Sequence, residues 1–240
     1  MTAFALILLV TCFVVLLLLA VPPTVARSAD ASAKTITPDL KAIADGKVAT
    51  IPAEVCVTWV EEAKGRPALR VQPTKTEFDE KDTWVVLLDG IEFTDGVIEF
   101  DALGQSGPPQ SNFIGVAFRV VDERHRDAIY FRPFNFRAED AARKARAIQY
   151  ISHPKFQWFD LRKDKPGQYE KPAAPAPDGD EWFHVRIVVE RPRVSVYVND
   201  AKEPSLVVEE LSGRTGGGIG LWVGPGQGGH FANLEITAAR

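Results

Sequence analysis

The sequence predicts an all-β fold, a sandwich or a barrel, and three observations support this prediction. Apolar and polar residues alternate along about a dozen short runs, which is the pattern of half-buried strands. Gly, Pro, Asn and Asp stand between these runs, and beyond Ala33 no helical apolar period lasts for three turns. Short strands separated by turn residues are typical of sandwiches and barrels.

The expected strands follow one another along almost the whole chain after residue 54. They span residues 55–60, 68–72, 83–88, 96–103, 113–121, 128–134, 147–152, 182–190, 193–199, 205–209, 218–223 and 230–238. Single sandwiches of about 200 residues are routine, so we expect one domain over residues 34–240.

Alternation also assigns side chains to the two faces of each strand. Strands 182–190 and 193–199 form a hairpin whose expected core residues are Phe183, Val185, Ile187, Val189, Val194, Val196 and Val198. In strand 128–134, Ile129 and Phe131 are expected to face inward, whereas Tyr130 and Arg132 share the outward face. Truncating Arg132 should therefore open no cavity in the core.

The composition is that of an ordinary globular domain, with 45% apolar and 25% charged residues in a chain of 240. The net charge of −4 argues against a broad basic surface, so we expect no nucleic-acid partner. Two cysteines cannot build a disulfide framework. Cys56 lies between two valines and is expected to be a small, buried, apolar residue.

The N-terminal segment 1–33 predicts export. Residues 3–21 are uncharged and apolar, Pro22 and Pro23 follow, and two Ala-x-Ala triplets occupy residues 29–33. This order is typical of a cleaved signal peptide, although the segment lacks a basic start and is long enough to remain as a membrane anchor. Either interpretation places residues 34–240 in the periplasm, at the cell surface or outside the cell.

Two stretches interrupt the strand pattern. Residues 137–147 are Ala-rich with mixed charge and could form two or three helical turns, which we interpret as a solvated surface insertion. Residues 163–180 carry several Pro and Gly and predict a long surface loop.

Several motifs do not meet the requirements of their chemistry. Residues 224–229 match the glycine pattern of dinucleotide-binding loops, but a strand follows instead of a helix, which predicts a hairpin turn. The four His residues stand far apart, and the acidic residues form no calcium-loop pattern. We therefore expect neither a metal nor a cofactor.

Glu99 and Asp101 lie on one face of strand 96–103, as the two acids of some retaining glycosidases do. Those enzymes place a third carboxylate two residues further on, where this chain has Leu103. Without that acid the leaving oxygen has no proton donor, so we interpret the pair as polar residues on a solvated face.

Several motifs in order resemble the concanavalin A-like lectin/glucanase (laminin-G-like) superfamily. These are residues 181–188 with 194–200, then 218–222 and 231–234, and upstream 93–101, 115–119 and 130–133. The upstream motifs look like a bacterial branch close to the 3-keto-disaccharide hydrolase domains. The resemblance implies a two-sheet antiparallel jelly roll that binds glycans on or beside its concave face.

Sugar recognition needs flat aromatic surfaces and planar polar groups. The residues of these types that alternation leaves outside the core, or places in adjoining loops, are Arg119, Tyr130, Arg132, Asn135, Gln149, Trp158 and Tyr169. We therefore expect an exported carbohydrate-binding domain. The alternatives are a glycan-cleaving hydrolase related to the 3-keto-disaccharide hydrolases and a non-catalytic protein-interaction domain.

The expected processing can be tested directly. Cleavage after the second Ala-x-Ala triplet should leave exported protein that begins near Lys34, as read by N-terminal sequencing. A membrane-bound chain that begins at Met1 would establish the anchor instead.

Overall fold

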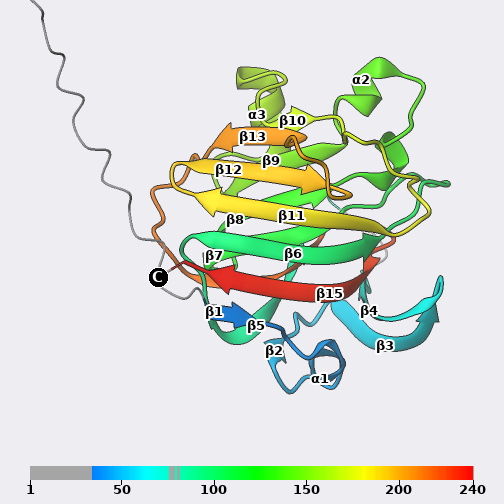
Figure 1. Ribbon diagram of the computed structural model, residues 1–240, viewed down its shortest axis with the longest axis vertical. Coiled ribbons are helices and arrows are strands. Elements are labelled where there is room, and N and C mark those ends of the chain that lie inside the picture. Colours follow the sequence, from blue (N-terminus) through cyan, green and yellow to red (C-terminus); the bar gives the residue numbers. More distant parts are fainter. Residues whose placement is uncertain (1–33, 76–78, 80–81, 240) are drawn as a thin grey trace, which may run out of the picture. The chain divides into compact units, whose positions relative to one another are not determined.

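The computed structural model describes residues 34–75, 79 and 82–239 and consists of two antiparallel sheets (Figure 1). Sheet A runs in the order β13 (Leu206–Glu209), β12 (Arg193–Val198), β11 (Phe183–Glu190), β6 (Gly96–Leu103), β15 (Gly229–Ala238), β4 (Arg66–Pro73) and β3 (Val55–Ala63), with β1 (Lys34–Ile36) paired to β15. Sheet B runs in the order β10 (Glu170–Lys171), β9 (Ile148–His153), β8 (His125–Phe131), β7 (Ile114–Asp122), β14 (Gly218–Val223), β5 (Trp84–Glu92) and β2 (Ala49–Thr50).

Every strand expected from alternation is present, with ends that differ by at most a few residues. The short strands β1, β2 and β10 were not predicted, because two or three residues carry no readable period. The side chains expected in the core from the hairpin β11–β12 are buried. Phe131 of sheet B meets Phe183 of sheet A with ring centroids 5.4 Å apart, so the inner faces of the two sheets form the core.

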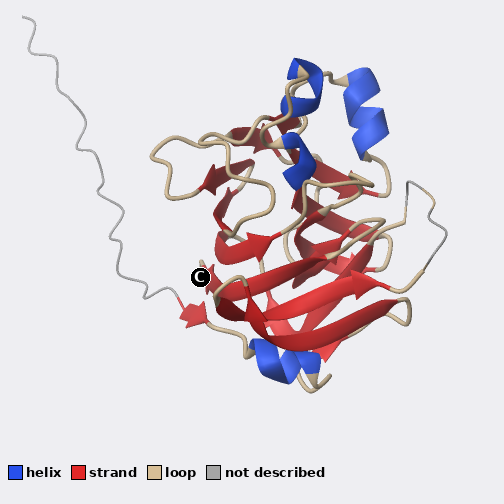
Figure 2. Cartoon of the chain, turned by 90° about the vertical axis from the view of Figure 1, so that its right-hand side faces the viewer, coloured by secondary structure: helices blue, strands red, loops and turns tan. Residues whose placement is uncertain are grey.

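Short helices stand at two ends of the sandwich (Figures 1 and 2). They are α1 (Leu40–Ala44) at one end and η1 (Pro133–Asn135), α2 (Ala141–Lys144) and α3 (Trp158–Asp164) at the other. Only one turn forms within residues 137–147, and the Asp140 carboxylate caps it by accepting from the Arg143 backbone N–H at 2.7 Å. Helix α3 was not predicted, since Leu161 is its sole fully buried residue and gives no period.

The link between β14 and β15 corrects one prediction. These strands do not pair, so residues 224–229 form a crossing from sheet B to sheet A and not a hairpin turn. Gly228 adopts a φ of +67°, and a Cβ atom there would lie 2.1 Å from the Val71 carbonyl oxygen. Glycine is therefore required by a close approach to β4.

Cys56 also differs from its prediction. The thiol is exposed, because Val55 takes the inward position of β3 and its neighbour points the other way. The expected N-terminal signal or anchor lies outside the described residues. Within the described part of the chain, no helix has both the length and the apolar character needed to cross a membrane.

A glycine in the middle of sheet B positions two aromatic rings. Gly115 of β7 pairs with Trp222 of β14 on one side and with Tyr130 of β8 on the other. Because Gly115 has no side chain, the two rings meet above it and stack, with centroids 4.5 Å apart and planes 23° apart. The stack lies on the outer face of sheet B, since neighbouring Ile129 and Phe131 occupy the core.

Gly115→Ala should destabilise the fold, because the new Cβ would lie 2.0 Å from the Ile129 carbonyl oxygen. Forcing an atom into a packed site costs about 1–3 kcal/mol, or a Tm lower by roughly 2–12 °C in a domain of this size. Thermal unfolding measures the effect, and Gly107→Ala, at an open position, serves as the matched control. Equal Tm values for the two variants would contradict the close packing of β7 against β8.

Candidate ligand-binding cleft

A cleft of about 500 Å³ opens on the outer face of sheet B. Its aromatic lining consists of Phe113, Tyr130, Phe134, Trp158 and Trp222. Its other lining residues are Arg132, Arg143, Arg146, Arg162, Asn135, Gln110, Ser111, Thr83, Asp79 and Pro225. Clefts of roughly 300–1,000 Å³ with apolar walls and a few placed polar groups are typical of small-molecule sites.

The floor of the cleft is a stack of three planar groups. Tyr130 and Trp222, each 2% exposed, form its lower layers. The Arg132 guanidinium carbon lies 4.8 Å from the Tyr130 ring centroid, and its Nη2 donates to the Tyr130 hydroxyl at 2.6 Å. Burial raises the pKa of the Tyr130 phenol and lowers the pKa of the Arg132 guanidinium. The floor is therefore rigid, apolar beneath and cationic at its surface.

The walls come from segments that follow or precede the strands of sheet B. Phe113, just before β7, meets Phe134 of η1 edge-on at 5.5 Å and Tyr130 edge-on at 6.1 Å. Trp158 begins α3 and is half-buried, with the Arg162 guanidinium 4.7 Å from its ring. Aromatic surface thus reaches the cleft from three separate parts of the chain.

Trp222 leaves one hydrogen-bond donor unused. Its indole Nε1 is buried and has no acceptor among the described residues. Buried polar groups almost always have a partner in the protein, in ordered water or in a ligand. Since Trp222 lines the cleft, water or a ligand held there can supply the missing acceptor.

The arginines of the cleft differ in their partners. Arg132 Nη1 donates to the Arg146 carbonyl oxygen at 2.8 Å, and Arg143 Nη2 donates to the Gln110 side chain at 2.9 Å. Arg162 forms a two-pronged pair with the buried carboxylate of Glu170, at 2.7 Å for Nη2. Arg146 lies 3.8 Å from the same carboxylate. Glu170 thus lies near both Arg162 and Arg146, whereas Arg132 and Arg143 contact neutral acceptors.

Four of the seven residues named from the sequence line this cleft: Tyr130, Arg132, Asn135 and Trp158. Gln149 and Tyr169 lie outside its lining and are buried. The Gln149 amide donates to the carbonyl oxygens of Tyr150 and Tyr169, so it joins β9 to the segment before β10.

Arg132 corrects the expectation of a solvated side chain. It is on the outward face as alternation predicts, but it is only 5% exposed. The segment that contains α2 covers it and accepts its hydrogen bond through Arg146. Removing Arg132 would therefore empty a packed position, contrary to the expectation that its truncation is harmless.

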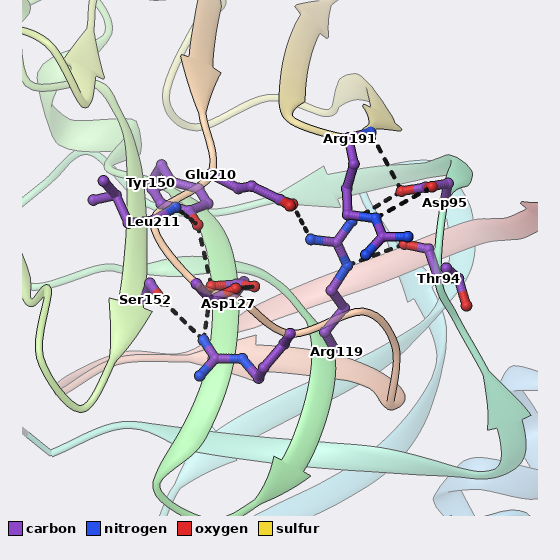
Figure 3. A network of polar contacts seen from close by, with 11 residues as sticks. Thr94, Asp95, Arg119, Asp127, Tyr150, Ser152, Arg191, Glu210 and Leu211 are labelled. Atoms are coloured by element: carbon purple, nitrogen blue, oxygen red, sulfur yellow. Dashed lines mark hydrogen bonds and ion pairs between the residues drawn. The ribbon is translucent and has the colours of Figure 1, made fainter.

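Arg119 lies in a polar network away from the cleft lining (Figure 3). It is 0% exposed, and its guanidinium donates to the Thr94 carbonyl oxygen at 3.0 Å, to Asp95 at 2.9 Å and to Glu210. Arg191 approaches Asp95 at 3.6 Å from the start of the β11–β12 turn. The network ties sheet B to the segment that leaves β13.

A second network holds the same segment a few residues later (Figure 3). The buried Asp127 carboxylate accepts from the Tyr150 hydroxyl at 3.1 Å, from Ser212 at 2.7 Å and from Arg214 at 2.8 Å. The Leu211 backbone N–H donates to the Tyr150 hydroxyl at 3.1 Å. Both networks fix the path from β13 in sheet A to β14 in sheet B.

Glu99 and Asp101 lie on the outer face of sheet A. Asp101 accepts from His184 Nδ1 at 2.9 Å and from Asn233 at 2.7 Å, and it pairs with Arg66. Glu99 lies 3.7 Å from His184 Nε2. These acids therefore belong to a cross-strand polar cluster on the sheet that does not carry the cleft.

The sequence interpretation missed Trp222, Phe113, Phe134 and the arginines Arg143, Arg146 and Arg162. Trp222 could have been found, because alternation places it opposite the core residue Leu221 in β14. Arg143 and Arg146 were assigned to a solvated insertion. Among the described residues no cluster of His, Cys, Asp and Glu could hold a metal ion.

Comparison with known proteins identifies the fold. No family model and no curated protein matches the sequence. A Bacillus subtilis protein of unknown function with a galectin-like fold is similar over 85% of this chain and 98% of its own, with TM-score 0.53 and 12% identity. The carbohydrate-binding module CBM66 from B. subtilis is similar over 77% and 96%, with TM-score 0.48 and 14% identity.

A further similar structure is the exoplasmic/lumenal domain of VIP36 in its Ca²⁺- and Man3GlcNAc-bound form, over 76% of this chain and 81% of its own, with TM-score 0.45 and 13% identity. At such identities the likeness to the galectin-like structure shows the fold alone. It confirms the two-sheet antiparallel sandwich, in agreement with a concanavalin A-like architecture.

Arg119→Met should lower the stability of the fold, because Arg119 is a structural residue outside the cleft. It leaves the nearly buried Glu210 without its guanidinium partner and leaves Asp95 with Arg191 alone, which costs about 3–5 kcal/mol, or a Tm lower by roughly 6–20 °C. Thermal unfolding measures this against Arg193→Met, an exposed arginine of β12. A ligand lost at unchanged Tm would instead make Arg119 a binding residue.

Proposed function

We propose that the protein is a carbohydrate-binding domain and that the cleft on sheet B holds the sugar. The observation that carries this proposal is the combination of aromatic walls with a floor whose polar atoms are fixed. Sugar rings present apolar C–H faces to aromatic rings and hydroxyl groups to planar donors and acceptors. Phe113, Phe134 and Trp158 supply the first kind of surface, and Arg143 and Asn135 supply the second.

The lining supports binding over cleavage. Hydrolysis of a glycosidic bond by the usual routes needs two carboxyl groups on opposite sides of that bond. Among the described residues, Asp79 is the single carboxylate in the lining. Glu170 lies outside the lining and forms an ion pair with Arg162. The acids Glu99 and Asp101 belong to the other sheet. A relation to the 3-keto-disaccharide hydrolases therefore rests on the sequence resemblance alone.

We further propose that the domain acts outside the cytoplasm. The apolar run at residues 3–21 and the Ala-x-Ala triplets that follow it support export. Free polysaccharides and cell-surface glycans are available there as ligands. A purely protein-binding role has less support, because such interfaces are usually flatter and larger than this cleft.

Trp158→Ala should weaken sugar binding while leaving the fold intact. The half-buried ring lies at the start of α3, outside both sheets, and its removal takes away one aromatic wall. Loss of such an anchor costs about 1–2 kcal/mol, a roughly 5- to 30-fold weaker affinity. An oligosaccharide array identifies a binder, and titration calorimetry compares the variants.

Trp59→Ala is the matched control, because this half-buried tryptophan lies on β3 of sheet A, far in the strand order from the cleft. It should bind as the wild type does. The proposal fails when the wild type binds no oligosaccharide on the array, or when both tryptophan variants bind equally well.

A further inference from the structure

The cleft is positively charged in a protein that is negatively charged overall. Four arginines line it, against Asp79 as the one carboxylate among the described lining residues. Outside the lining, Glu170 pairs with Arg162 and Arg146, and Asp140 caps the turn that carries Arg143. The complete chain carries a net charge of −4. A local excess of guanidinium groups is therefore a property of this site and not of the surface in general.

Two of these guanidinium groups have no carboxylate partner among the described residues. Arg132 donates to a backbone carbonyl oxygen and a tyrosine hydroxyl, at 2.8 and 2.6 Å. Arg143 donates to the side-chain oxygens of Gln110 and Asn135, at 2.9 and 3.3 Å. Neutral acceptors orient the two groups, and within the described part of the chain no carboxylate pairs with either side chain.

The remaining two arginines share one carboxylate. Glu170 is buried, and both Arg162 and Arg146 approach it, so a single negative charge faces two positive ones. The charges of Arg162 and Arg146 add to the effect of burial in lowering the pKa of Arg132. Glu170 opposes this effect but is one carboxylate against two arginines, so Arg132 still faces the like charges of Arg162 and Arg146, and a bound anion would relieve this repulsion.

We propose that the sugar bound in this cleft is anionic and carries a carboxylate or a sulfate ester. This inference rests on the proposed carbohydrate-binding function. The planar guanidinium fork matches a carboxylate or sulfate through two parallel hydrogen bonds, and such charge-assisted bonds are about twice as strong as neutral ones. The aromatic walls hold the ring of the sugar, while Arg143 holds its acidic group and the buried guanidinium of Arg132 adds positive charge beneath it.

The test uses matched pairs of oligosaccharides. The panel contains oligomers of galacturonate, glucuronate and mannuronate, each beside its carboxyl-reduced counterpart, and a sulfated galacto-oligosaccharide. We expect at least one acidic member to bind ten-fold or more tightly than its neutral counterpart, with an affinity that falls as salt is raised. Tighter binding of a uronate or of the sulfated oligomer identifies which acidic group is recognised.

Arg143→Met locates the recognition. Because its side chain forms no ion pair with the described residues, the variant should keep its Tm within a few degrees. It should lose roughly ten-fold in affinity for the acidic sugar and less than two-fold for any neutral one. Arg143→Lys keeps the positive charge but not the planar fork, so its affinity for the acidic sugar should lie between those of Arg143→Met and the wild type. Arg193→Met should bind the acidic sugar as the wild type does.

The outcomes separate the two proposals. Binding of neutral and reduced oligosaccharides that equals or exceeds binding of the acidic ones overturns the anionic ligand but retains a sugar-binding cleft. Unchanged binding of the acidic sugar by both Arg143 variants also overturns it. A wild type that binds nothing on the panel or on the array removes both proposals together.

Discussion

A missing side chain at the centre of sheet B is the constraint on which the cleft depends. Gly115 stands between Trp222 and Tyr130 in one row across three strands, and its bare backbone lets the two rings close over it. Arg132 then finds a flat aromatic surface to lie on. A side chain at this position would meet the backbone of β8, with its Cβ 2.0 Å from the Ile129 carbonyl oxygen, so β8 and the Tyr130 that it carries would have to move. The position of the positive charge in the site therefore depends on how the two aromatic rings pack.

The buried arginine explains why the segment around α2 belongs to the site. Moving a guanidinium out of water is costly unless its donors are satisfied, and Arg132 is satisfied by the Arg146 carbonyl oxygen and the Tyr130 hydroxyl. The backbone of residues 137–147 is thus tied to the floor, which brings Arg143 and Arg146 to the rim. Together with the bonds from the Arg132 backbone N–H to the Ala147 carbonyl oxygen and from Arg143 to Asn135, this contact makes the insertion a wall of the cleft.

The sequence predicted the strands well. Strand β11 has one buried face and therefore a clear period of two, whereas β8, β9 and β14 are buried on both faces and were marked also by the turn residues around them. It predicted the cleft in part, since alternation marks Tyr130 and Arg132 as outward but cannot show that another segment covers them. Arg119 was assigned to the site because alternation leaves it outside the core. The structure buries it instead: β7 is irregular between Phe118 and Asp122, and Arg119 has a φ of +50°. Its partners Asp95 and Glu210 lie 24 and 91 residues away, beyond the reach of any local pattern.

The path of the chain on either side of β14 has a consequence for selectivity. Strand β14, which carries Trp222, follows β13 and precedes β15, both of which belong to sheet A. Two buried polar networks fix the segment between β13 and β14. A floor anchored in this way is pre-organised, so an incoming ligand spends little free energy on ordering it. The rim consists of helices of one or two turns that contribute few residues to the core. Related chains could exchange these short segments to change their ligands, while the sandwich beneath kept the same stability.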